Sequence, residues 1–312
     1  LYHAFTTGGP MPLAPLPLQY ADFAVWQRRW LSDAVLDRHV DYWRQQLGDV
    51  VGKGELFPRR TRAGRPSRRR GLHPLSISAE LSQGLKELSR RHQATLFMTL
   101  LAAFDVVLHA ETGQSRFVVG TDVANRRDAR LESLVGFFVN RLVLKADVNR
   151  DNSFEALLAQ VRGVTLGAYD HQDLPFERLV EALRPARDAG RYPLFQVLFV
   201  LQNTPGATLT LPGLEVDRFP VDRRETTADL ILTMTEMPGG LSGVFEFDVD
   251  LFEQRTVVQL ASKLGTVIDE IVKDAGVLVG TLAERLGEVD RAVQRSKRQT
   301  YAAALDRSLR RT

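Results

Sequence analysis

Few side chains in this 312-residue sequence have the type and spacing that catalysis requires. Cysteine is absent, which removes disulfides, thiolate metal sites and thiol nucleophiles together. The sequence contains no HExxH zinc spacing, GxSxG nucleophile elbow, phosphate-binding P-loop or GxGxxG motif. The six histidines are scattered, and no two are adjacent: His3, His39, His73, His92, His109 and His171. A single histidine acts as a base only with a partner and a pocket, so these residues alone predict no complete catalytic site.

A run of arginines stands out among the charged residues. Seven arginines fall between Arg59 and Arg70, although the net charge of the chain is only +3. Such a run could bind the phosphates of a partner, or it could be a solvated surface loop. No aromatic residue that could stack on a base is interleaved with it, so we expect no nucleic-acid partner.

The composition is that of an ordinary globular chain, with 44% hydrophobic and 25% charged residues. No apolar run approaches the roughly 20 residues of a membrane span, and no charged-then-apolar leader opens the chain, so we expect no membrane partner. The lack of cysteine fits a reducing, cytoplasmic location. Arginines become frequent and large apolar residues rare after Leu282. This change predicts a core-forming unit over residues 1–284 and a basic helical linker or docking tail over 285–312.

Helical and strand patterns alternate along the chain. Apolar residues three and four positions apart predict helices from about Tyr20 and over 33–47, 78–88, 95–112, 153–169, 175–183 and from 253 onward. Strands are predicted over 72–77, 116–120, 137–144, 194–201, 229–235 and 241–247, the last two forming a hairpin around Pro238-Gly239-Gly240. Mixed helices and strands, with sheet neighbours far apart in sequence, favour an α/β lobe.

Four short segments, in one order along the chain, carry a family resemblance. They are residues 20–26 (YADFAVW), 135–140 (VGFFVN), 171–177 (HQDLPFE), and Arg187-Asp188 followed by Pro193-Leu194. Together they resemble the later core motifs of condensation domains of nonribosomal peptide synthetases, which join two carrier-bound acyl units by an amide bond. The resemblance extends from about residue 1 to about residue 284.

This resemblance implies two chloramphenicol-acetyltransferase-like lobes arranged in a V. The chain would supply the second lobe, an α/β unit with a mixed sheet flanked by helices. The family's catalytic HHxxxDG motif is expected just upstream of Leu1, because the sequence has no adjacent pair of histidines. The chain is therefore interpreted as the carboxyl-terminal part of a condensation domain, inactive without that motif.

The resemblance places the candidate site between residues 120 and 140. The segment from Gly120 looks like the loop at the floor of the family's substrate tunnel, and Asn140 closes the motif beside it. Amide-bond formation passes through a tetrahedral oxyanion, so Asn140 could donate to that oxygen, or it could satisfy amides at the strand end. Glycine at 136 could keep the tunnel open or mark a strand bulge. The predicted tunnel residues are Gly120, Asp122, Asn125, Arg126, Gly136 and Asn140.

The remaining motif residues are predicted to be structural. Phe23 and Trp26 are expected to pack their helix onto the sheet. His171 is expected to fix a turn, and Asp173 to cap the helix that opens at Leu174-Pro175. Arg187 could pair with Asp188 or reach across to the other lobe, and residues 189–192 depart from the family's usual Ser-Arg-Asn-Pro-Leu at two positions. The structural set is Tyr20, Asp22, Trp26, His171, Asp173, Arg187 and Asp188.

The function implied by the resemblance is attack of an acceptor amine on a carrier-bound thioester. The implied partners are peptidyl or acyl carrier proteins and the upstream lobe. No metal or diffusible cofactor is implied, because the phosphopantetheine arms belong to the carriers. The basic tail does not resemble the start of an adenylation domain, which leaves a second interpretation open: a non-catalytic module that docks a tailoring enzyme or a carrier. A third, the epimerisation subtype, is disfavoured by the VGFFVN segment.

Overall fold

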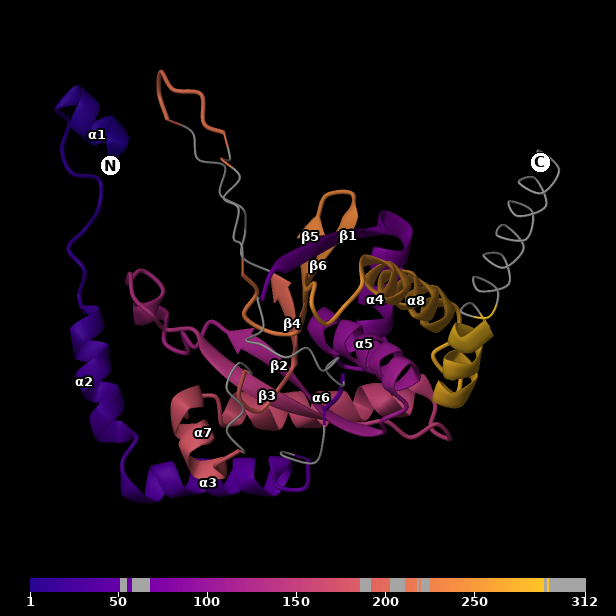
Figure 1. The fold of residues 1–312 in the computed structure, drawn as a ribbon. Helices are drawn as coiled ribbons and strands as arrows, with labels where there is room; N and C mark the ends of the chain where they lie inside the picture. The colour runs from indigo at the N-terminus through magenta and orange to yellow at the C-terminus, as the bar shows by residue number, and fades with distance from the viewer. Residues whose placement is uncertain are drawn as a thin grey trace.

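A six-stranded mixed sheet lies at the centre of the computed structural model (Figure 1), which describes residues 1–50, 55–57, 68–185, 192–202, 211–217, 219, 225–288 and 291. The strand order is β1-β6-β5-β4-β2-β3. β4 runs parallel to both of its neighbours, and the other pairs are antiparallel. The strands are β1 (Arg70–Ser78), β2 (Arg116–Val123), β3 (Asn140–Asp147), β4 (Val197–Gln202), β5 (Leu230–Met237) and β6 (Gly240–Asp248).

Eight α-helices carry labels in Figure 1, and a short 3-10 turn lies at Ala129–Leu131. They are α1 (Tyr2–Thr7), α2 (Tyr20–Trp30), α3 (Asp33–Leu47), α4 (Ala79–Arg91), α5 (Leu96–Thr112), α6 (Phe154–Asp170), α7 (Phe176–Leu183) and α8 (Gln254–Lys273). Side chains and a glycine cap two of these helices where backbone groups need partners. Ser78 accepts from the amide of Leu81 and Thr95 from that of Met98, and Gly113 ends α5 in the left-handed conformation at φ 69°.

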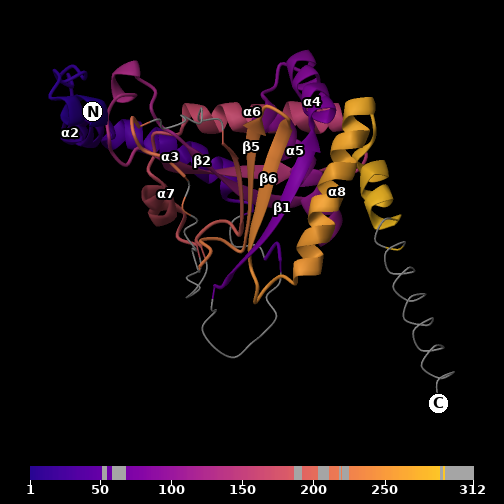
Figure 2. The same ribbon diagram turned by 90° about the horizontal axis from the view of Figure 1, so that it is seen from above.

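The core lies between the sheet and a layer of helices on one of its faces (Figure 2). α5 is buried on every side from Met98 to His109, which explains its largely apolar sequence. Its Phe104 ring contacts Phe199 of β4 and Phe245 of β6. α4, α6 and α8 pack around α5, so this layer and the sheet enclose one continuous apolar cluster.

The amino-terminal helices are arranged differently. α3 lies beside α7, and α2 rises from the start of α3 away from the sheet, with α1 beyond it (Figure 1). α2 buries no side chain fully. It meets a small separate cluster, in which Leu18, Tyr20 and Phe23 pack on Leu131, Leu134 and Phe138. The prediction that Phe23 and Trp26 pack on the sheet is therefore wrong, because α2 packs on the loop between β2 and β3.

The predicted fold class is confirmed: the chain is α/β, with a mixed sheet flanked by helices. Two strand starts were predicted three residues too early. β3 begins at Asn140 and not at 137, and β4 begins at Val197 and not at 194. In the first case residues 137–139 belong to the loop that contacts α2. The division at residue 284 remains a prediction, since residues 289–290 and 292–312 lie outside the described part.

No single helix in the described part of the chain has both the length and the apolar character to cross a membrane. Taken together, α4 and α5 are long and apolar enough to cross a membrane, but the two helices are bent by 105° at the break between them.

Candidate functional site

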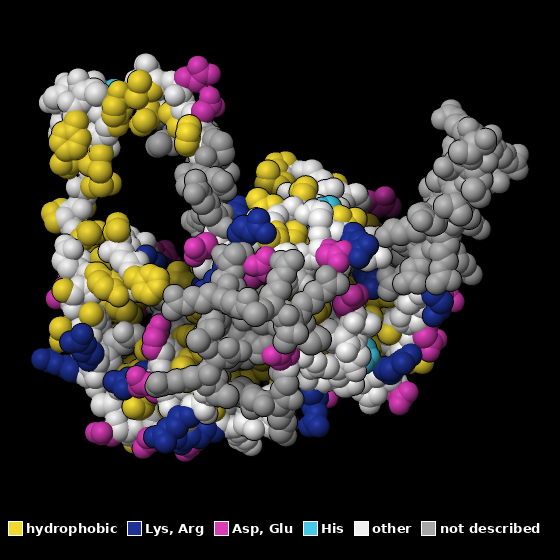
Figure 3. Space-filling model, in the orientation of Figure 1, with side chains coloured by type: hydrophobic (Ala, Val, Ile, Leu, Met, Phe, Trp, Pro, Cys, Tyr) yellow, Lys and Arg dark blue, Asp and Glu magenta, His cyan; other side chains and the backbone are white. Residues whose placement is uncertain are grey.

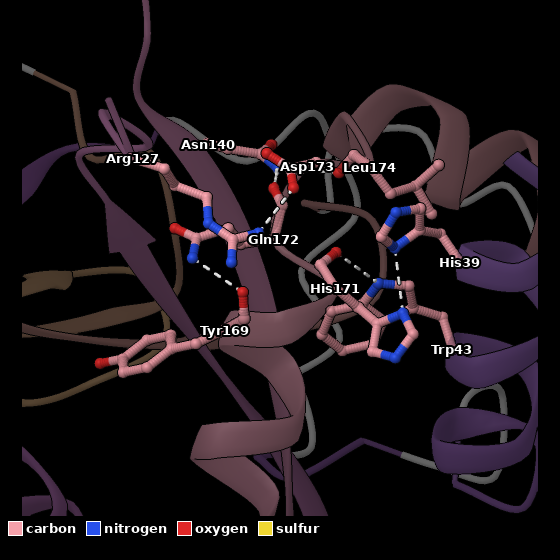
Figure 4. Close-up of polar contacts among 9 residues, drawn as sticks. All are labelled: His39, Trp43, Arg127, Asn140, Tyr169, His171, Gln172, Asp173 and Leu174. Carbon is pink, nitrogen blue, oxygen red and sulfur yellow. Dashed lines mark hydrogen bonds and ion pairs between the residues drawn. The ribbon is translucent and has the colours of Figure 1, made fainter. Parts of the chain in front are cut away.

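The turn between α6 and α7, residues 171–175, belongs to the third motif segment and lies where that segment meets Asn140, the last residue of the second. It follows the carboxyl end of α6 and leads into α7. Asn140 and Arg127 hold it on one side, and His39 and Trp43 of α3 hold it on the other (Figure 4). The site is therefore built around this turn.

Asn140 uses its whole side-chain amide on this turn. Its Nδ2 donates to the carbonyl oxygens of Gln172 at 2.7 Å and Leu174 at 2.8 Å. Its Oδ1 accepts from the backbone N–H of Phe176, the first residue of α7, at 3.0 Å. The residue is 8% exposed. An amide has only two N–H donors, so none remains for a substrate oxygen. Of the two alternatives left open by the sequence, this geometry favours backbone satisfaction over oxyanion donation.

Asp173 does not cap α7, contrary to the prediction. The N-cap position is Pro175, which has no side-chain cap, and Asn140 supplies the acceptor instead. Asp173 pairs with Arg127 at 2.9 Å, with 16% of the Asp173 side chain exposed. The pair joins the turn to the loop between β2 and β3.

His171 joins the turn to α3, and its role in fixing the turn remains a prediction. Its Nδ1 lies 3.0 Å from the Nδ1 of His39. Its ring stacks on Tyr42 at 3.9 Å between ring centres and 5° between planes. Its carbonyl oxygen accepts from the Trp43 indole N–H at 3.3 Å. His39 was not among the predicted site residues, although its place on the apolar face of α3 with Val40 and Trp43 was a signal.

Both imidazoles resist protonation. Burial is the main cause that lowers the pKa of His39, and the ring of His171 adds to it, while Asp173 opposes the shift. Burial likewise lowers the pKa of His171, with Asp170 opposing and Arg38 adding to the effect. Burial, assisted by Asp170, raises the pKa of Tyr42 to about 12. At neutral pH this junction is therefore a set of neutral rings.

The first and second motif segments also meet directly. The ring of Tyr20 lies over Gly136 so closely that a Cβ there would overlap it. Its hydroxyl donates to the carbonyl oxygen of Phe137 at 3.0 Å. Glycine is required at 136 because the Tyr20 ring takes the place of a side chain. This is a packing reason that neither sequence alternative for Gly136 contained.

Asp22 and Trp26 complete the first segment. Asp22 accepts from the backbone N–H of Gln19 at 2.9 Å, which caps the start of α2. Trp26 is 51% exposed and stacks on Trp30 at 5.4 Å between ring centres. Trp26 is thus a surface residue and not part of the core.

The predicted tunnel residues at the end of β2 and after it fall into two groups. Asp122 pairs with Arg141 across β2 and β3 at 3.0 Å, and Arg141 lies over the Tyr192 ring. Arg126 turns the other way, over the Phe138 ring and onto the carbonyl oxygen of Leu131. Asn125 has a positive φ of 52°, and its side-chain oxygen is buried without a hydrogen-bond partner.

Gly120 is covered on one side, because the ring of Phe195 lies where its Cβ would be. The structure thus brings Arg126, Gly136 and Asn140 together around the loop of residues 124–139. It places Gly120 against Phe195 and pairs Asp122 with Arg141. Arg187 and Asp188 lie outside the described residues, as do residues 59–67 of the arginine run.

The described residues offer no further site at this junction. Among them, no group of three or more His, Cys, Asp or Glu side chains could hold a metal ion. A surface hollow of about 750 Å³ lies elsewhere, at the opposite end of β3 from Asn140, beside Asp147, Asn149 and Arg150. No motif segment lines it.

Comparisons with known proteins agree with this architecture. The family model for the Condensation domain matches residues 1–283. A linear gramicidin synthase protein of Brevibacillus parabrevis is 41% identical over 270 residues, which is 86% of this chain and 4% of that protein. The chain therefore belongs to the condensation domain family, and it spans a small part of the curated relatives that it matches.

Solved structures show the same fold. The X-domain from teicoplanin biosynthesis superposes with a TM-score of 0.78 at 27% identity, over 88% of this chain and 64% of that one. A complex of the X-domain and OxyB from teicoplanin biosynthesis matches with a TM-score of 0.78 at 26% identity, over 89% of this chain and 63% of the matched chain. About a third of each matched chain thus has no counterpart here.

Proposed function

We propose that this chain provides the carboxyl-terminal lobe of a nonribosomal peptide synthetase condensation domain. In the reaction, the amine of a carrier-bound aminoacyl acceptor attacks the thioester carbonyl of a carrier-bound acyl or peptidyl donor. A C–N bond forms, the C–S bond breaks, and the donor's phosphopantetheine thiol leaves with a proton. Family membership supports this reaction class.

One observation carries the proposal: the first three motif segments form a single assembly beside an apolar face. Tyr20 fixes the loop at Gly136 and Phe137, and Asn140 at the end of that loop fixes the turn before α7. Beside this assembly, Val135 is 93% exposed and Phe137 79% exposed. Hydrophobic side chains also gather over α1, α2 and the residues between them (Figure 3): Leu1, Tyr2, Phe5, Met11, Leu13, Leu16, Val25 and Trp26.

Exposed apolar surface of this extent marks an interface. We assign it to the upstream lobe of the same domain, since about a third of the solved X-domain lies outside the part that this chain matches. The catalytic HHxxxDG motif would lie in that lobe. Gly120, Asp122, Asn125 and Arg126 would then line the tunnel between the lobes. Carrier proteins would bring the phosphopantetheine arms into it.

The test is to mix this chain, alone and together with the upstream lobe, with loaded donor and acceptor carriers. Mass spectrometry of the carriers follows the amide product. We expect product only when the upstream lobe is present, because the proposed base lies there. Product well above background from this chain alone would refute the division of the site.

A recruitment role is the second candidate function. It is favoured by the likeness to the teicoplanin X-domain, which has been solved as a complex with OxyB. If the complete domain forms no amide but binds a tailoring enzyme, the recruitment role holds. The residues at the HHxxxDG positions separate the two functions directly, because an intact motif is needed only for catalysis.

A further inference from the structure

His39 and His171 make a close ring-to-ring contact, and the proposed reaction gives neither residue a role. The two Nδ1 atoms are 3.0 Å apart, and the rings are nearly perpendicular, at 84°. Such a contact is a hydrogen bond only if one Nδ1 carries a hydrogen and the other offers a lone pair. One ring must therefore be neutral with its hydrogen on Nε2.

We propose that the His39–His171 pair is a pH-sensitive latch that holds the α2–α3 arm, residues 20–47, against the turn of residues 171–175. A first proton can be accepted at Nε2 of the donor ring without breaking the hydrogen bond. A second proton must bind the lone pair of the acceptor ring. Each Nδ1 then carries a hydrogen, so two N–H groups and two positively charged rings face each other at contact distance. The hydrogen bond is lost and the latch opens.

The charged groups around the pair set the pH at which this happens. Arg38 of α3 and Arg127 of the loop before β3 disfavour protonation, whereas Asp170 and Asp173 at the end of α6 and in the turn favour it. Asp173 is already paired with Arg127 at 2.9 Å, which reduces its support for a charged imidazole. Burial outweighs both carboxylates, since the pKa of each ring is lowered, so a doubly protonated pair is poorly stabilised.

The turn and the α2–α3 arm differ in the other contacts that fix them. The turn stays fixed through Asn140, which bonds Gln172, Leu174 and Phe176. The carboxyl end of α3 stays fixed through Leu47, which is fully buried, and the following Asp49, which pairs with Lys145 at 2.8 Å. The part left to move is the amino-terminal half of α3 with the Trp30 end of α2, because the Trp30 ring lies 6.0 Å from that of His39. The Tyr20 end of α2 stays attached at Gly136.

Tryptophan fluorescence can report this motion selectively. The chain has three tryptophans, Trp26, Trp30 and Trp43, and all lie on α2 and α3. We would titrate wild-type chain from about pH 8 to about pH 5 and compare His39→Gln and His171→Gln, with His92→Gln as the matched control. Wild type and control should show a change in emission with a midpoint below about pH 6.5, and both latch variants should lose it.

A change that persists in both latch variants, or no change in wild type, would overturn the proposal. A second measurement does not depend on the variants folding. In wild-type chain with ¹⁵N-labelled histidine, NMR near neutral pH should show one of the two rings with hydrogen on Nδ1 and the other without. Two rings that both carry hydrogen only on Nε2 would exclude the hydrogen bond. Neither measurement depends on the proposed function.

Discussion

At the scale of single residues, the site depends most on Asn140, because every polar atom of its side chain is hydrogen-bonded to the backbone. Asn140 bonds two carbonyl oxygens of the turn before α7 and the first backbone amide of α7. A buried amide can do this only when all three groups surround it, so the residue and the turn depend on each other. We therefore expect Asn140 to act through structure before it acts on chemistry.

Replacement of Asn140 by alanine should lower the free energy of unfolding by roughly 2–4 kcal/mol, because it leaves a helix-end amide and two carbonyls without partners. Urea denaturation measures the loss. Asn149→Ala is the matched control, since Asn149 makes one local bond to the amide of Asp151 at an exposed turn. Equal stability of the two variants would show that the turn is held by something other than Asn140.

The histidine pair gives a pH dependence whose sign follows from its lowered pKa values. Above about pH 6.5 both folded and unfolded chains carry neutral imidazoles, and the contribution to stability is complete. Below it the unfolded chain binds protons that the folded junction resists, so stability falls as the pH falls. Thermal melts near pH 7.5 and pH 5.5 should show this loss in wild type, and a smaller loss in His39→Gln.

At the scale of elements, α2 is the least secured helix of the fold. It is attached through the small cluster around Phe138 and through the Tyr20 ring over Gly136. This attachment explains why the loop of residues 135–139 is not part of β3, although its sequence is as apolar as that of a strand. The competing contact with α2 decides the conformation of the loop.

Gly136→Ala should release α2, because the added Cβ overlaps the Tyr20 ring and overpacking of this kind typically costs about 1–3 kcal/mol. Limited proteolysis should then cut faster within residues 8–30, while the melting temperature of the sheet changes little. In a Tyr20→Ala background the same glycine substitution should have almost no further effect. A full effect in that background would remove Tyr20 as the reason for the glycine.

At the scale of the whole molecule, the α/β class, the mixed sheet and most element bounds could be predicted, because apolar periodicity and caps are local properties of the sequence. The site was harder to predict. Asn140 caps α7 through a contact between residues 36 positions apart, and His39 meets His171 across 132 positions. No local sequence pattern encodes such contacts. Trp26 was assigned to the core for a related reason: its helical spacing indicates an apolar face, but not what covers that face.

The apolar face formed by α1, α2 and the loop of residues 135–139 is the main interface that we propose for the whole molecule. Phe137→Ser should weaken association with the upstream lobe at least tenfold, which is about 1.4 kcal/mol, because an exposed aromatic at an interface centre is a typical anchor. The stability of the isolated chain should not change, since Phe137 is 79% exposed. Titration against labelled upstream lobe measures the affinity. Val258→Ser, on the far helix α8 and 42% exposed, is the control.

The first two motif segments contribute to one apolar face, and we place that face against an upstream lobe. Hydrogen–deuterium exchange of this chain, with and without that lobe, tests the placement most directly. We predict that the lobe slows exchange in residues 1–26 and 135–139 and leaves α8 and β1 unchanged. Protection confined to α8 or to β1, with residues 135–139 exchanging as before, would contradict it.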